Sequence, residues 1–97
     1  MREYEVTVIL KPDLDEEARN QLIERVQDWL APGAADEDKA AVSHWGQRSL
    51  AYPIRKFTEG YYVFYEARLD PLRINEIERN IIYAEDILRH LVVRKDD

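Results

Sequence analysis

Hydrophobic and polar residues alternate between positions 3 and 10, a period of two that predicts a strand with one buried face. The residues on that face are Tyr4, Val6, Val8 and Leu10. Proline has no backbone N–H to donate to a sheet, so the Lys11-Pro12-Asp13 segment is expected to end the strand.

From position 14 the apolar residues recur three or four apart, which predicts a helix that stops at Pro32-Gly33. We expect Asp13 to cap this helix, with Glu16 three residues later as the second member of a capping box. The stripe that faces the core consists of Leu14, Ala18, Leu22, Val26, Trp29 and Leu30. The small and acidic segment 31–41 is expected to be a loop.

Two extended segments, 42–54 and 61–69, are predicted to form a hairpin. Gly46 indicates a bulge in the first segment, and Phe57–Gly60 is expected to be the turn, with Gly60 at positive φ. In the second segment, one side is expected to face the helices and holds Val63, Tyr65, Ala67 and Leu69. The opposite side holds Tyr62, Phe64, Glu66 and Arg68.

The remaining chain predicts a second helix and a last strand. Asp70 followed by Pro71 is typical of a helix start. The apolar stripe of this helix consists of Ile74, Ile77, Ile81 and Ala84. Residues 87–94 are predicted to form a strand that is apolar on both sides, which is typical of a central or covered strand.

The order strand, helix, strand, strand, helix, strand predicts an α+β fold, a ferredoxin-like split βαβ sandwich (βαββαβ). It would place two helices on one face of a four-stranded antiparallel sheet and leave the other face bare. The 97 residues fit one domain, 1–97, and no apolar run approaches the roughly 20 residues that span a membrane. The absence of cysteine suits a reducing compartment.

The sequence favours a protein without catalytic activity, cofactor or metal. There is no cysteine nucleophile, and the only serines, Ser43 and Ser49, lie in one predicted strand. His44 and His90 lie in different strands, and no phosphate-loop, dinucleotide-binding or zinc-protease motif occurs.

The net charge of −6 argues against nucleic acid as a partner, but the charges are unevenly distributed. Residues 13–38 carry nine acids and two bases, whereas residues 39–58 carry four bases and no acid. A local basic stripe can bind phosphates because salt screens distant acids over about 8 Å. The alternative is that these bases are ordinary solvated strand residues that protect sheet edges from pairing.

Aromatic residues are interleaved with the bases, and Tyr62 and Phe64 are expected on the bare sheet face. Such residues can stack RNA bases or form an apolar patch for a protein partner. The first strand offers Glu5, Thr7 and Ile9 on this face rather than another aromatic, which favours a protein contact or simple packing over base stacking.

Four segments carry a family resemblance: Met1-Arg2-Glu3-Tyr4-Glu5, Trp45-Gly46-Gln47-Arg48-Ser49-Leu50-Ala51-Tyr52-Pro53-Ile54-Arg55-Lys56, Gly60-Tyr61-Tyr62 and Leu88-Arg89-His90-Leu91-Val92-Val93-Arg94. Together they resemble the bacterial small-subunit ribosomal protein six family over essentially the whole chain. The resemblance implies a structural, cytoplasmic ribosomal protein without catalytic activity. It also implies binding to the central domain of 16S rRNA, as a heterodimer with small-subunit ribosomal protein eighteen.

The resemblance also implies candidate sites by position. The rRNA contacts would be Arg2, Tyr4, Arg48, Arg55, Lys56, Arg89 and Arg94. The protein-partner contacts would be Trp45, Leu50, Tyr52, Tyr62 and Phe64. Ser49 stands where many members have a second basic residue, which is expected to remove one phosphate contact or edge-protecting charge. Glu85 stands where many have asparagine, which is expected to alter only a turn.

A second hypothesis stays open, a ferredoxin-like module that senses a small molecule or homo-oligomerises through the edge of its long second strand. The ribosomal hypothesis predicts an isolated monomer that binds RNA weakly without a basic partner. The second hypothesis predicts a stable homodimer at micromolar concentration.

Overall fold

The computed structural model describes residues 1–95, and these contain four strands, two α-helices and two 3₁₀ turns. In chain order they are β1 (Arg2–Leu10), α1 (Glu16–Leu30), η1 (Asp36–Asp38), β2 (Ala41–Ile54), β3 (Phe57–Leu69), η2 (Pro71–Arg73), α2 (Ile74–Tyr83) and β4 (Ile87–Arg94). The last two residues of the predicted 1–97 domain lie outside the described range.

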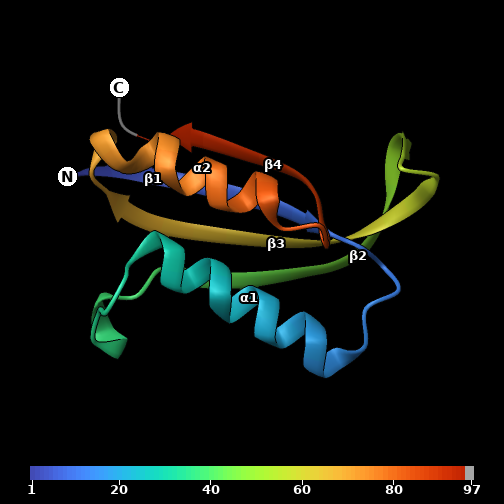
Figure 1. The fold of residues 1–97 in the computed structure, drawn as a ribbon, viewed down its shortest axis with the longest axis horizontal. Helices are drawn as coiled ribbons and strands as arrows, with labels where there is room; N and C mark the ends of the chain where they lie inside the picture. Colours follow the sequence, from blue (N-terminus) through green and yellow to red (C-terminus); the bar gives the residue numbers. More distant parts are fainter. Residues whose placement is uncertain (96–97) are drawn as a thin grey trace.

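The strands form one antiparallel sheet in the order β2-β3-β1-β4. Both helices lie on the same side of this sheet, as Figure 1 shows. No helix of the described residues covers the other side (Figure 1). The predicted ferredoxin-like split βαβ sandwich is therefore confirmed.

The helix-facing residues of the two central strands form the middle of the core. Val6 lies opposite Tyr65 and Val8 lies opposite Val63, and all four are fully buried. The helices contribute Leu22, Ile23, Val26, Leu30, Ile77 and Ile81. The Tyr65 hydroxyl donates a hydrogen bond to the Ile23 carbonyl at 3.0 Å, so the polar end of this buried side chain has a partner. The alternation in the sequence predicted these faces correctly.

The N-terminal cap of α1 is Asp15, and the prediction of Asp13 was wrong. The Asp15 carboxylate accepts a hydrogen bond from the Ala18 backbone N–H at 2.7 Å. Glu16 is the first residue of the helix rather than a capping-box partner. Aspartate is a suitable capping residue at either position, and in the structure Asp15 has the extended backbone of a cap, with ψ 166°.

The turn of the β2–β3 hairpin is Arg55-Lys56, so the prediction of Phe57–Gly60 was wrong. Both turn residues have positive φ, 50° and 70°, as a two-residue type I′ connection requires. Ile54 pairs with Phe57 directly across the turn. Two non-glycine residues therefore adopt a conformation that normally favours asparagine or glycine.

Two glycines in the hairpin have different roles. Gly46 has φ +85° at a shift in the β2–β3 register, which confirms the predicted bulge. Gly60 lies within β3 rather than in the turn. A Cβ added at Gly60 would collide with Cγ2 of Ile9, so glycine is needed there for close packing and not for its φ angle.

β4 is an edge strand, which differs from the central or covered position that its apolar pattern predicted. Its outward-facing Leu91 and Val93 are exposed, Leu91 by 59%. A register shift at Leu10 brings Ile87 into the core while Arg89 lies opposite Ile9 on the bare face. The two apolar sides of β4 therefore do not correspond to two covered faces.

The connection into α2 brings a contact that links the two helices. Asp70 accepts a hydrogen bond from the Leu72 N–H, so the predicted cap is confirmed, although it starts η2 and α2 follows from Ile74. Arg73 donates hydrogen bonds to the Trp29 and Leu30 carbonyls at 3.1 and 3.4 Å. Arg73 thereby caps the C-terminus of α1.

Candidate nucleic-acid interface

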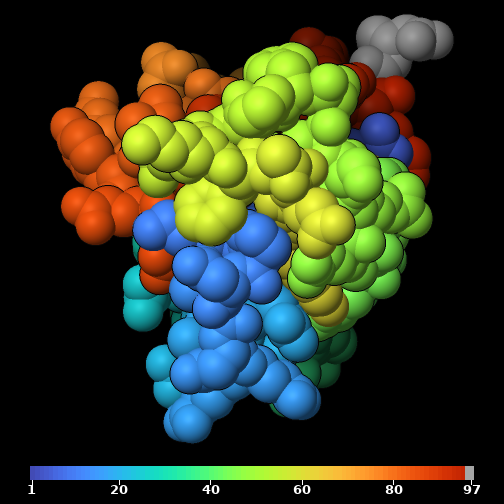
Figure 2. Space-filling view, turned by 90° about the vertical axis from the view of Figure 1, so that its right-hand side faces the viewer, coloured from blue at the N-terminus to red at the C-terminus, as the bar shows by residue number. Residues whose placement is uncertain are grey.

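The tip of the β2–β3 hairpin reaches the start of β4, although β2 and β4 occupy opposite edges of the sheet. Arg89 donates a hydrogen bond to the Tyr52 hydroxyl, and its guanidinium lies 5.7 Å from the centroid of that ring. Arg55 donates a hydrogen bond to the Glu85 carbonyl at 2.7 Å. In Figure 2 the yellow-green hairpin tip lies against the orange and red residues around the start of β4.

This hairpin covers one end of the sheet face that the helices leave bare. Ile9 points to that face yet is only 8% exposed. Gly60 packs against the Ile9 side chain, and Leu50 borders the same position. The bare face is therefore closed at the hairpin end and open towards the start of β1.

A basic corner forms where the hairpin meets β4. We define the basic corner as Lys11, Arg55, Lys56 and Arg89, the four cations at this junction. Lys11 joins it because its backbone N–H donates to the Asp86 carbonyl at 2.9 Å and its ammonium lies 3.6 Å from the Asp86 carboxylate. Glu85 and Asp86 are the acids of the adjoining loop, so the corner keeps an excess of positive charge.

An aromatic stack lies on the bare face, in the part of the sheet where Phe64 pairs with Thr7. The Trp45 and Phe64 rings are parallel, with centroids 5.1 Å apart and 9° between their planes. The Arg48 guanidinium lies 5.3 Å from the centroid of the Trp45 ring. Trp45 therefore already covers one face of Phe64, and Trp45 remains 45% exposed. This arrangement fits a protein contact better than the open aromatic platform that stacks RNA bases.

The other predicted rRNA contacts lie at the opposite end of the sheet or in its interior. Arg2 pairs with Leu69 at the start of β1, and Arg94 pairs with Tyr4 at the end of β4, so these two arginines are neighbours. Tyr4 belongs to the hydrophobic core with 8% exposure, which gives it a packing role. The structure therefore brings together Arg55, Lys56 and Arg89 but not all seven predicted residues.

Acidic residues occupy the open end of the bare face. Glu3 and Glu5 lie there opposite Arg68 and Glu66. Lys95 contacts Glu66 at 3.0 Å, and this hydrogen bond raises the pKa of the Lys95 ammonium above its ordinary value. The acids at this end of the bare face are therefore accompanied by Arg68 and Lys95, whereas the basic corner lies at the hairpin end.

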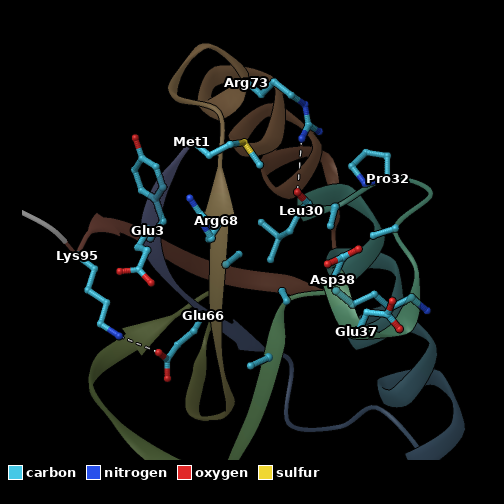
Figure 3. Close-up of a pocket in the computed structure, with 17 residues that line it drawn as sticks. Met1, Glu3, Leu30, Pro32, Glu37, Asp38, Glu66, Arg68, Arg73 and Lys95 are labelled. Carbon is cyan, nitrogen blue, oxygen red and sulfur yellow. Dashed lines mark hydrogen bonds and ion pairs between the residues drawn. The ribbon is translucent and has the colours of Figure 1, made fainter.

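An open depression of about 670 Å³ lies between the start of β1, the end of α1 and the end of β3. Figure 3 shows the residues that line it. Glu37 and Asp38 line one side, and Arg68 and Arg73 also contribute to its wall. The Arg73 guanidinium already donates hydrogen bonds to carbonyls at the end of α1. The lining is a mixture of charges without a converging set of polar groups.

Residues 1–95 contain no cluster of three or more His, Asp or Glu side chains that could hold a metal ion. His44 is 3.0 Å from the Tyr61 hydroxyl through Nδ1, and His90 is 3.9 Å from the Glu78 carboxylate. Neither of these two contacts joins a histidine to a serine, the pairing that could activate a serine nucleophile. No helix within that range is long and apolar enough to cross a membrane.

Sequence reasoning missed the contact between Tyr52 and Arg89. The two residues were assigned to different sites, Tyr52 to the protein partner and Arg89 to RNA. They are 37 positions apart on strands at opposite edges. No local pattern carries that information, because the contact depends on how far the hairpin bends beyond the sheet.

A family model described as Ribosomal protein S6 matches residues 3–94 of this chain. The small ribosomal subunit protein bS6 of Caldanaerobacter subterraneus subsp. tengcongensis is 40% identical over 97 residues, which cover all of both chains. That of Desulforudis audaxviator is 38% identical over 96 residues, 99% of this chain and 100% of the relative. The crystal structure of 30S ribosomal protein S6 from Thermotoga maritima is similar at 33% identity with a TM-score of 0.86, covering 97% of this chain and 87% of that one.

Proposed function

Because the chain belongs to the ribosomal protein S6 family and is a structural component of the small ribosomal subunit rather than an enzyme, we propose that it binds the central domain of 16S rRNA together with small-subunit ribosomal protein S18. As a ribosomal protein it functions in translation, in the ribosome of the bacterial cytoplasm. The observation that carries the proposal is the basic corner at the hairpin tip.

The basic corner supports direct contact with phosphate. Arg55, Lys56 and Arg89 come from two segments that are distant in sequence and meet at one end of the molecule. Arginine forks match the geometry of phosphate oxygens, and each neutralised phosphate releases bound counterions. Arg48 extends the positive charge from the corner onto the bare face.

The net charge of −6 supports a requirement for a basic co-binder. A chain with an acidic sum neutralises few phosphates by itself, so its affinity for RNA alone is expected to be weak. The Trp45–Phe64 stack together with Tyr62 offers apolar surface for that partner, and the nearby Glu3, Glu5 and Glu66 complement basic side chains.

Filter binding tests this function with a central-domain rRNA fragment, the purified chain and purified S18. We expect weak binding by either protein alone and at least tenfold tighter binding by the two together. Sedimentation of the chain alone is expected to show a monomer. Tight and salt-insensitive binding by the isolated chain would contradict the proposal.

A charge-reversal pair tests whether the predicted contacts lie on the RNA side. Arg48→Glu with Arg55→Glu is expected to lower the joint affinity at least tenfold with little loss of stability, because both side chains are exposed. The matched control is Arg25→Glu with Arg79→Glu, which changes the net charge equally on the exposed helical side. Equal losses in the two pairs would show that the net charge matters and the position does not.

A further inference from the structure

Two hydrogen bonds tie the tip of the hairpin to the segment that begins β4. Arg89 of β4 donates to the Tyr52 hydroxyl in the hairpin, and Arg55 in the hairpin donates to the Glu85 carbonyl before β4. The ties run in opposite directions, since each segment supplies one arginine and one acceptor. Residues 52–55 and 85–89 are therefore held together at two points, and one arginine from each edge of the sheet is fixed near the same junction.

Each tie leaves most of its arginine available to a ligand. A guanidinium carries five N–H donors, and each of these contacts uses one of them. Tyr52 contributes both its hydroxyl oxygen and its ring to the Arg89 contact. A side chain that is held in one place loses less conformational freedom when it binds phosphate.

We propose that Tyr52 is a positioning residue which holds the Arg89 guanidinium beside Arg55, so that the closed hairpin forms one clamp for the ribose-phosphate backbone of RNA. This inference rests on the rRNA-binding function proposed above and specifies how one part of that site works. It reassigns Tyr52 from the protein partner to the RNA side.

The charges that face the clamp come from three segments. Lys56 follows Arg55 in the turn, and Lys11 lies at the end of β1. The loop before β4 supplies Glu85 and Asp86, and Lys11 pairs with Asp86 at 3.6 Å. With four cations and two carboxylates, the junction keeps a positive balance that attracts a phosphate-bearing strand.

The clamp is tested by a double-mutant cycle on rRNA affinity in the presence of S18. Arg89→Gln removes one phosphate contact, so it is expected to weaken binding several-fold and to reduce the slope of log K against log salt by about one. Tyr52→Phe keeps the ring and removes the hydrogen bond. It is expected to weaken binding about threefold to tenfold and to leave the salt slope unchanged, because Arg89 is still present.

The decisive comparison is Tyr52→Phe in the Arg89→Gln background. If Tyr52 acts through Arg89, its substitution has no further effect there, whereas a contact of its own with RNA or S18 gives the same loss in both backgrounds. Tyr61→Phe is the matched control, since the Tyr61 hydroxyl also contacts a side chain, His44, but on the helix-facing side of the sheet. It is expected to leave rRNA affinity unchanged.

Different experimental results would contradict the clamp and the proposed function. Additive losses from Tyr52→Phe and Arg89→Gln, or no loss from Tyr52→Phe, would overturn the clamp while the unmodified chain still binds rRNA with S18. Absence of joint binding by the unmodified chain would overturn the proposed function itself. Urea unfolding of each variant separates a positioning effect from general destabilisation, because a positioning residue changes affinity at unchanged stability.

Discussion

At the scale of single residues, Tyr65 couples the stability of the core to pH. Its ring is buried in the middle of the sheet and its hydroxyl donates to the Ile23 carbonyl. Burial raises the pKa of the Tyr65 hydroxyl well above its ordinary value of about 10. Above that pH the unfolded chain releases this proton while the folded chain keeps it, so the free energy of unfolding falls as pH rises.

Tyr65→Phe is therefore expected to cost less stability at high pH than at neutral pH. At about pH 7 it removes the hydrogen bond to Ile23 and lowers the free energy of unfolding by about 1 kcal/mol. Above about pH 10 the difference from the unmodified chain shrinks by up to about 1.4 kcal/mol per pH unit, because the variant has no proton to hold. Urea unfolding at about pH 7 and about pH 11 measures both values. A constant difference at the two pH values would contradict the prediction.

The face of the sheet on which a side chain lies was predictable wherever polar and apolar residues alternate along a strand. Tyr62 and Phe64 were assigned to the bare face from their parity alone, and the register of β1 against β3 confirms it. The role of Gly60 was not predictable, because its requirement is set by Ile9 on a neighbouring strand. In the sequence, a glycine near a hairpin is a turn signal. Only the packing in the structure shows that Gly60 is required by its close contact with Ile9.

At the scale of elements, the start of α1 shows what a cap contributes. Asp15→Ala is expected to lower the free energy of unfolding by about 1 kcal/mol, because the Ala18 N–H loses its partner at the positive end of the helix. Asp13→Ala is the matched control and is expected to stay within about 0.5 kcal/mol of the unmodified chain, since Asp13 caps nothing. Equal effects in urea unfolding would show that only the charge near the helix matters.

The hairpin turn combines conformational strain with positive charge. Lys56 has φ 70°, a region in which a side chain costs about 1–2 kcal/mol relative to glycine. Lys56→Gly is therefore expected to raise the free energy of unfolding by up to about 1 kcal/mol, and Lys56→Ala is not. Both variants lose the same ammonium group and are expected to lose the same rRNA affinity. Unequal losses of affinity would indicate that turn stability, rather than charge, determines binding.

Element boundaries in this hairpin were harder to predict than the elements themselves. The sequence predicted two paired strands correctly but placed the turn at Phe57–Gly60, because Gly60 is a stronger turn signal than Arg55-Lys56. The position of β4 at an edge also escaped prediction. Its apolar pattern on both sides reflects a register shift at Leu10 and exposed Leu91 and Val93, not a second covering layer.

At the scale of the whole molecule, the acidic turn η1 and the basic corner lie towards opposite ends of the longest dimension. The molecule measures 37 Å along that axis. Figure 1 places the loop that contains acidic η1 at the end opposite the hairpin tip. The Debye length at about 0.15 M salt is about 8 Å, so the acids of η1 are screened from a phosphate bound at the basic corner. The net charge of −6 therefore describes no single surface of the molecule.

This separation predicts that the effect of net charge depends on salt. The triple variant Asp36→Asn, Glu37→Gln, Asp38→Asn removes three negative charges and changes the net charge from −6 to −3. At about 0.15 M salt its rRNA affinity with S18 is expected to equal that of the unmodified chain within about twofold, because η1 lies several Debye lengths from the corner. At about 0.01 M salt the Debye length grows to about 30 Å, which approaches the 37 Å length of the molecule, and the affinity is expected to rise.

Filter binding across this range of salt measures the effect, and a variant of the basic corner supplies the comparison. Arg55→Gln with Lys56→Gln changes the net charge by two in the opposite direction, to −8, and is expected to weaken binding at both salt concentrations. A gain in affinity by the η1 variant at about 0.15 M salt would place RNA within about a Debye length of Asp36–Asp38. In that case RNA would extend along the molecule to the acidic end, and the hairpin corner would be only one part of a longer binding surface.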